Sequence, residues 1–192
     1  MAPFVGLTGG LGAGKSEALR LLGELGAATL STDAVVHELL SGDDLRAELV
    51  DRFGPEVAPD GMLDRGRIAE RVFRDDEARA WLERLLWPRV GERVAAWRAQ
   101  LGDGTVAVVE VPLLFESGME AVFDSTIAVV ADEQLREQRA AARGHAAVAE
   151  RAGRQLSQQE KAQRADFTVR NDGSLDELKQ ALSRVLAKLE EQ

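Results

Sequence analysis

Hydrophobic and polar positions along this chain predict strands and helices in alternation. Apolar runs at residues 4–8, 27–31, 106–111 and 126–131 predict four strands, and residues 167–170 form a weaker fifth candidate. The third and fourth runs are rich in β-branched residues, which is typical of strands covered on both faces in a parallel sheet. We therefore expect an α/β fold in which helices flank a five-stranded parallel sheet.

Apolar residues at helical spacing separate these runs. The helix after the first strand is expected to carry Leu19, Leu22 and Leu25 on its buried face. Residues 34–101 read as mainly helical, with one interruption rich in Gly, Pro and Asp at residues 54–61. We therefore expect residues 1–33 and 102–192 to form a core, and residues 34–101 to form a helical insert.

Two details of the helices can be predicted from single residues. Pro88 suits the first turn of a new helix, and Trp87 before it is expected to pack in the core, with a place beside a ligand as the alternative. Residues 174–177 read Ser-Leu-Asp-Glu, the pattern of a capping box. This box predicts the start of the last helix.

A glycine-rich loop follows the first predicted strand. Residues 9–16 read Gly-Gly-Leu-Gly-Ala-Gly-Lys-Ser, which satisfies the phosphate-loop pattern in its required strand–loop–helix context. Backbone N–H groups of such a loop bind phosphate oxygens, the lysine bridges the β- and γ-phosphates, and the hydroxyl binds Mg²⁺. The residues expected to bind ATP are Gly10, Leu11, Gly12, Ala13, Gly14, Lys15 and Ser16, with Ser16 also the expected metal ligand. The alternative is a glycine-rich turn with a surface lysine.

Asp33 is a candidate general base. It follows the second predicted strand, and the carboxyl ends of parallel strands face the ligand crevice in open α/β sheets. A carboxylate there can orient an acceptor hydroxyl and take its proton. Asp is also favoured at the N-cap of a helix, here one beginning near Ala34. The two roles are compatible.

Positive charge is concentrated at residues 136–164, which contain seven basic and three acidic residues and so carry a net charge of +4. The rest of the chain carries −13. Arg136, Arg139 and Arg143 lie at helical spacing on one face. This segment is either a solvated helix face or a lid that clamps phosphates, and the phosphate loop upstream favours the lid.

Composition narrows the choice of function. The formal net charge of −9 over 192 residues argues against a nucleic-acid binder or a basic membrane-surface protein. The chain has no cysteine, so disulfides and thiolate metal sites are excluded. The opening residues Met1-Ala2-Pro3-Phe4 lack the features expected of a signal peptide, and no later apolar run approaches about 18 residues. We expect a soluble, cytoplasmic protein that acts on a small molecule; its oligomeric state is left open.

Several motifs together resemble the dephospho-CoA kinase family over nearly the whole chain. Residues 5–16 are similar to the family's opening signature, and Thr32-Asp33-Ala34 is similar to its acidic motif. Gly61-Met-Leu-Asp-Arg65 resembles a motif of its helical insert, and Val111-Pro-Leu-Leu-Phe-Glu116 resembles its most distinctive segment. Ala165-Asp166 together with Asn171-Asp-Gly173 resembles its closing strand and turn.

The resemblance implies a phosphate-loop kinase core with a helical acceptor domain and a lid. The implied reaction moves the γ-phosphoryl group of Mg²⁺-ATP to the ribose 3′-hydroxyl of dephospho-CoA. Lys15, Asp33, Arg139 and Arg143 are then the expected catalytic residues. Asp33, Arg65, Leu113 and Leu114 are the residues expected to bind the acceptor.

Three positions depart from the family pattern: Glu17, Arg136 and Trp87 stand where a hydroxyl residue, Gln and His are common. A nucleoside, shikimate or gluconate kinase would share the loop and the lid, so another small-molecule kinase is the main alternative. A nucleotide-dependent switch is disfavoured, since the chain has no Asn-Lys-x-Asp motif.

Overall fold

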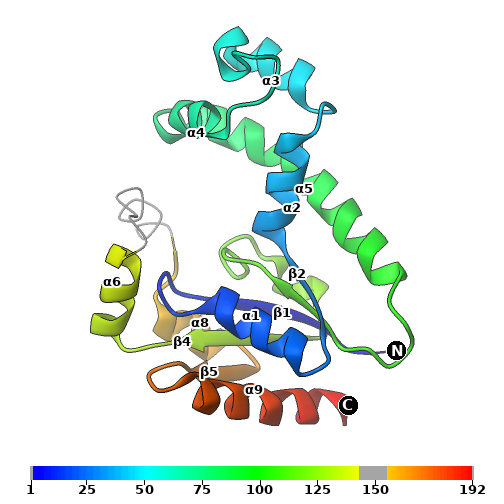
Figure 1. The fold of residues 1–192 in the computed structure, drawn as a ribbon, viewed down its shortest axis with the longest axis vertical. Coiled ribbons are helices and arrows are strands. Elements are labelled where there is room, and N and C mark those ends of the chain that lie inside the picture. The colour runs from blue at the N-terminus through cyan, green and yellow to red at the C-terminus, as the bar shows by residue number, and fades with distance from the viewer. Residues whose placement is uncertain (1, 143–154, 192) are drawn as a thin grey trace. The chain divides into compact units, whose positions relative to one another are not determined.

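A five-stranded sheet organises the fold in the computed structural model, which describes residues 2–142 and 155–191. All pairings between neighbouring strands are parallel, and the strand order is β2-β3-β1-β4-β5 (Figure 1). The strands are β1 (Phe4–Gly9), β2 (Ala28–Ser31), β3 (Ala107–Glu110), β4 (Ser125–Val130) and β5 (Phe167–Arg170). The predicted α/β class and all five strands are confirmed.

The chain divides into two compact units. The first comprises Met1–Ser31 and Leu101–Gln192 and contains the sheet, and the second comprises Thr32–Gln100 and is helical. Among the described residues, no helix combines the length and the apolar character needed to cross a bilayer.

Helices of the first unit cover both faces of its sheet. Alternation along β1 sends Leu7 to one face and Thr8 to the other. Leu7 belongs to an apolar core shared with α1 (Lys15–Glu24) and α9 (Leu175–Glu190), which pack against each other. On the face of Thr8, helix α8 (Gln158–Arg164) packs against β4 and β1. Helix α6 (Glu133–Ala142) follows β4 in the chain.

The helical unit has a smaller core of its own. Its elements are α2 (Thr32–Ser41), α3 (Arg46–Phe53), the 3-10 helix Pro55–Val57, α4 (Arg65–Phe73) and α5 (Asp76–Ala99). Leu45, Leu49, Val57 and Ile68 are almost completely buried there. The predicted interruption at residues 54–61 coincides with the 3-10 helix and the turns around it.

The prediction of a new helix at Pro88 is wrong. Helix α5 runs through Pro88 without a break, so the proline lies in its interior. Proline cannot donate a backbone hydrogen bond to the carbonyl four residues earlier, which costs stability but does not always end a long helix. The Asp75 cap, whose side chain accepts bonds from two backbone N–H groups, and the buried Leu82, Leu86 and Val90 stabilise α5 on both sides of the proline.

The prediction that Trp87 packs in the core is also wrong, because this residue is 36% exposed. The apolar face of α5 passes through Leu86 and Val90, and Trp87 lies next to this face. Trp81 is the better packed indole, with its ring edge-on to Phe53 at 5.4 Å between centroids.

The predicted capping box at α9 is confirmed. The Ser174 side chain accepts a hydrogen bond from the Glu177 backbone N–H at 3.3 Å, and the Glu177 carboxylate accepts one from the Ser174 N–H at 2.7 Å. These two bonds satisfy N–H groups that the first turn of a helix leaves without partners. The bonds from Ser174, the backbone one first, hold the pKa of Glu177 below its ordinary value of 4.5.

Ser174→Ala is expected to lower the free energy of unfolding by about 1 kcal/mol, the usual effect of removing a serine N-cap. Urea unfolding measures this, and Ser183→Ala, an exposed change within the same helix, is the control that should not destabilise. Because the pKa of Glu177 is lowered in the folded protein, its carboxylate contributes to the free energy of unfolding above pH 4.5. This contribution disappears as the pH falls through the folded pKa. A larger difference between the two proteins at low pH than at pH 7 would contradict this account of the cap.

Candidate functional site

The glycine loop joins β1 to α1 and is held in a conformation that requires glycine. Gly12 and Gly14 have φ angles of 73° and 94°, in the left-handed region. A Cβ atom on Gly12 would overlap the backbone of Arg136, and one on Gly14 would overlap the side-chain amide of Asn171. The loop backbone is therefore packed closely against groups from distant parts of the first unit.

Lys15 begins helix α1 and turns back over the loop. Its Nζ donates hydrogen bonds to the carbonyls of Gly9 and Gly10, both at 3.1 Å. The ammonium thus lies at the carboxyl end of β1. Ser16, the next residue, is exposed in the first turn of α1, where the positive end of the helix dipole lies.

Two side chains hold the loop from the outside. Arg136 on α6 donates from Nε to the Leu11 carbonyl at 2.9 Å, and Asn171 donates from Nδ2 to the Ala13 carbonyl at 2.8 Å. Arg139 in turn donates to the Asn171 carbonyl at 3.0 Å.

Both arginines are half-buried, so the interpretation of this helix face as solvated is wrong for Arg136 and Arg139. Arg143 lies outside the described residues, as does part of the expected lid at residues 136–164.

Asn171 was not among the predicted site residues. It directly follows β5, so its position after a strand of the parallel sheet was an available signal. The neighbouring Asp172 accepts a bond from the Asp132 N–H at 2.6 Å and one from Arg170 at 3.0 Å. These contacts, the backbone one first, lower the pKa of Asp172. The turn after β5 is thereby fixed against the turn after β4.

The segment after β3 lies on the same face of the sheet as Thr8. Leu114 is completely buried and packs where Gly6 leaves room for it, so its side chain supports the segment rather than lining a surface. Leu113 is half-buried. Glu110, at the end of β3 and only 5% exposed, is a buried carboxylate that the sequence analysis did not single out.

A buried ion pair joins this segment to α8. Lys161 is completely buried, and its Nζ lies 2.9 Å from Glu116 Oε1 and 2.7 Å from the Pro112 carbonyl oxygen. Burial lowers the pKa of Lys161, and the neighbouring Glu116 carboxylate opposes this effect. From the sequence, Lys161 was one basic residue among seven in the expected lid.

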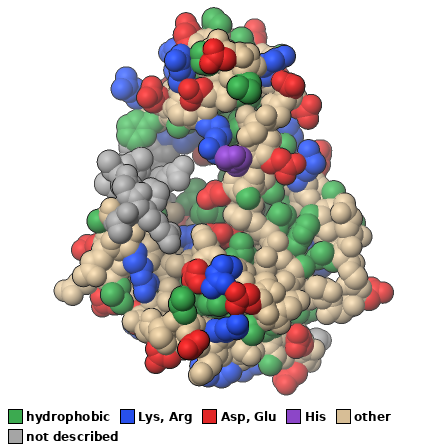
Figure 2. Space-filling view, in the orientation of Figure 1, with side chains coloured by type: hydrophobic (Ala, Val, Ile, Leu, Met, Phe, Trp, Pro, Cys, Tyr) green, Lys and Arg blue, Asp and Glu red, His purple; other side chains and the backbone are tan. Residues whose placement is uncertain are grey.

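Two of the predicted acceptor residues, Asp33 and Arg65, belong to the helical unit. Asp33 is the second residue of α2, which begins at Thr32, so the N-cap interpretation of Asp33 is wrong. Its side chain is exposed and makes no hydrogen bond or ion pair with any described residue. His37 lies one turn further along α2, and Arg65 at the start of α4 contacts its Nδ1. Figure 2 shows the imidazole in purple against basic side chains.

The side chains around the glycine loop suit a metal ion that binds together with a nucleotide. The described part of the chain contains no group of three or more His, Cys, Asp or Glu side chains placed to hold a metal ion. Mg²⁺ commonly takes only one or two protein ligands and completes its shell with phosphate oxygens and water. An exposed Ser16 hydroxyl beside a phosphate loop matches that requirement.

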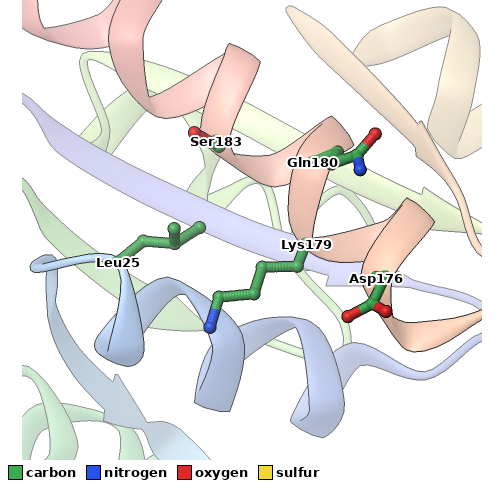
Figure 3. Close-up of a pocket in the computed structure, with 5 residues that line it drawn as sticks. All are labelled: Leu25, Asp176, Lys179, Gln180 and Ser183. Carbon is green, nitrogen blue, oxygen red and sulfur yellow. The ribbon is translucent and has the colours of Figure 1, made fainter.

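A shallow pocket elsewhere on the first unit does not belong to this site. It lies between α9 and the end of α1 and is lined by Leu25, Asp176, Lys179, Gln180 and Ser183 (Figure 3). Lys179, one of these residues, pairs with Glu24, with 2.9 Å between Nζ and Oε2. Glu24 ends α1 and Lys15 begins it, so the pocket is a helix length, roughly 15 Å, from the glycine loop.

Comparison with known proteins connects this geometry to one family. Residues 3–177 match the family model described as dephospho-CoA kinase. A dephospho-CoA kinase of Thermobifida fusca is 43% identical over 122 residues, covering 62% of this chain and 61% of the relative. One of Bordetella avium is 46% identical over 116 residues, covering 59% of this chain and 54% of the relative. The matched region thus spans less than two thirds of these relatives.

Solved structures agree over the whole length of the chain. A Thermus thermophilus protein superimposes with a TM-score of 0.85 at 34% identity, covering 97% of both chains. A dephospho-CoA kinase from Campylobacter jejuni superimposes with a TM-score of 0.74 at 26% identity, covering 100% of this chain and 98% of that one. A shikimate kinase from Acinetobacter baumannii, at 14% identity and a TM-score of 0.53, shares the fold. The expected resemblance is confirmed, and the chain belongs to the dephospho-CoA kinase family.

Proposed function

We propose that this protein transfers the γ-phosphoryl group of ATP to the ribose 3′-hydroxyl of dephospho-CoA, giving CoA and ADP. The observation that carries the proposal is the glycine loop, with Lys15 folded over its backbone, in a chain that matches the family model over residues 3–177. The proposal includes magnesium as the divalent ion and a cytoplasmic location.

In this proposal the loop binds the triphosphate. Backbone N–H groups between Gly10 and Ser16 face the phosphate oxygens, and Lys15 exchanges the Gly9 and Gly10 carbonyls for the β- and γ-phosphates. Ser16 supplies the protein ligand of Mg²⁺, which neutralises charge on the phosphates when bound. Phosphate oxygens are better partners for an ammonium than neutral carbonyls are, so the exchange is favourable.

Asp33 acts on the acceptor. Its exposed carboxylate takes the proton of the 3′-hydroxyl as the oxygen forms a bond to the γ-phosphorus. The bond from that phosphorus to the oxygen it shares with the β-phosphate breaks, and the electron pair leaves with ADP. Arg65 and Leu113 contact the acceptor, and Arg139 and Arg143 bind the oxygens on which negative charge grows.

The test is phosphoryl transfer from ATP to a panel of acceptors. Dephospho-CoA, adenosine, shikimate and gluconate are offered in turn, with and without EDTA. We expect CoA from dephospho-CoA in the presence of Mg²⁺, and no product when EDTA is added. Preferential turnover of another acceptor would favour the alternative small-molecule kinase, and equal turnover in EDTA would contradict the role of Ser16 and the metal.

Arg139→Ala is expected to lower kcat by on the order of 10², with a smaller change in both KM values, because the guanidinium acts on charge that develops in the transition state. Steady-state kinetics measure this. Arg184→Ala, an exposed change on α9, is the matched control. A change confined to KM would indicate uniform binding of the substrate, and unchanged kinetics would remove Arg139 from the site.

A further inference from the structure

Lys161 is the largest side chain that the described residues bury completely. Lysine is almost never fully buried without partners, and this one has three. Its Nζ lies 2.7 Å from the Pro112 carbonyl, 2.9 Å from Glu116 Oε1 and 3.4 Å from Thr8 Oγ1. Three stretches of chain that are far apart in sequence therefore meet at one ammonium group.

The three partners of Lys161 stand next to the candidate site. Thr8 is two residues before Gly10, whose carbonyl accepts a bond from Lys15. Pro112 and Glu116 enclose the segment that contains Leu113. Thr8 also donates to the Pro112 carbonyl, at 3.3 Å. The ammonium thus ties the segment after β3 to the strand that leads into the glycine loop.

Other contacts of α8 and the residues before it act on the same segment. The Leu156 N–H donates to Glu116 Oε1 at 2.9 Å, so that oxygen has two donors. Arg164, one turn after Lys161, lies over the ring of Phe115 at 4.8 Å and pairs with Glu120. Figure 1 shows α8 behind the sheet near β4. The segment is therefore held at several points, and at one of them the side chain that holds it, Lys161, is completely buried.

A buried ion pair is a poor way to add stability. Removing two charges from water is costly, and apolar residues of similar volume often stabilise a protein as well or better. What an ammonium adds is direction, because its three N–H donors fix the positions of the acceptors around them. An apolar side chain at position 161 would fill the space without holding the Pro112 carbonyl or the Glu116 carboxylate.

We propose that Lys161 is a positioning residue for the phosphoryl transfer: it holds the segment from Pro112 to Glu116 against the end of β1, and so sets where the acceptor lies relative to the γ-phosphate. The inference rests on the proposed function. Lys161 itself touches neither substrate, since its side chain has no exposed surface. Its loss should therefore affect the use of the acceptor more than the binding of ATP.

The test compares two variants with a matched control. Lys161→Met removes the ammonium but leaves the Glu116 carboxylate, whose side chain is only 13% exposed, without its cation, which should lower the unfolding temperature. The double variant K161M/E116Q removes both charges, so it should recover most of this stability. Lys179→Met is the control, because it removes a lysine whose ion pair with Glu24 lies at the surface. Kinetics are measured well below each unfolding temperature, together with backbone hydrogen exchange.

We expect the double variant to fold, yet to keep a kcat/KM for dephospho-CoA lower by roughly 10- to 100-fold, the scale of a misplaced reacting group. Its KM for ATP should stay within about twofold of the wild type, because the misplaced group belongs to the acceptor and not to the nucleotide. Amide exchange should become faster at residues 113–117 and remain unchanged along α9. Recovery of full turnover in the double variant would show that Lys161 only balances charge, and would overturn the proposal.

Three further results would count against a positioning role. These are failure of both variants to fold, unchanged exchange at residues 113–117, and a parallel loss of ATP and acceptor use. A wild-type protein inactive on dephospho-CoA would instead refute the proposed function. The kinetics would then be measured with whichever acceptor of the panel the wild-type protein uses. The comparison of amide exchange at residues 113–117 does not depend on the acceptor and would still test the role of Lys161.

Discussion

Lys15→Ala is expected to reduce phosphoryl transfer by about 10²- to 10³-fold, the scale seen when a donor to developing charge is removed. The substitution takes away the one side-chain cation of the glycine loop, while the backbone N–H groups and Ser16 remain. Lys15 is half-buried and turned onto the carbonyls of Gly9 and Gly10, outside the apolar core that supports α1. We therefore expect the unfolding temperature to change little.

Single-turnover kinetics and circular dichroism together test this expectation. Lys179→Ala is the control, since it removes a half-buried lysine of α9 that pairs with Glu24, and it should leave turnover unchanged. If Lys15→Ala unfolded, the lysine would have a structural role in closing the loop. If it kept wild-type turnover, the loop would not be the phosphate site of the reaction.

Asp33→Asn is expected to lower kcat by roughly 10² to 10⁴, the usual range for the loss of a positioned general base. Asparagine keeps the size of the side chain and cannot accept the proton of a hydroxyl. The side chain is exposed and has no partner among the described residues, so the fold should be unaffected. Binding of ATP, measured by calorimetry, should be retained.

Asp51→Asn is the matched control for this variant, because Asp51 is an exposed aspartate on α3 of the same helical unit. It should leave kcat unchanged. A near-normal kcat for Asp33→Asn would show that Asp33 is not the base. A loss of ATP binding would place Asp33 at the nucleotide instead of the acceptor.

Local patterns were sufficient for the strands, the glycine loop and the capping box. Each depends on residues close together in sequence, such as the apolar run of β4 or the pair Ser174 and Glu177. Pro88 and Trp87 show where local reasoning fails. Packing of Leu82, Leu86 and Val90 keeps α5 continuous through the proline, and this continuous helix leaves Trp87 partly exposed beside its buried face.

Long-range contacts were beyond the reach of sequence patterns. Lys161 and Glu116 are 45 positions apart and come from elements of different type, so neither periodicity nor a motif connects them. The bond from Asn171 to the loop carbonyl of Ala13 spans 158 positions. The prediction of Asp33 as a base used only the end of β2, and the start of α2 at Thr32 removed the competing role as a cap.

The order of the strands has a consequence for how this protein is made. β1 leaves the ribosome first, yet its two neighbours in the sheet are β3 and β4, and Leu7 pairs with Glu110. Synthesis at about 5–20 residues per second places seconds between these partners, during which all of α2 to α5 emerges. Apolar strand residues such as Val5 and Leu7 stay unpaired over that interval. Nascent chains stalled before β3 should therefore bind chaperones through residues 4–9, and chains extended past β4 should release them.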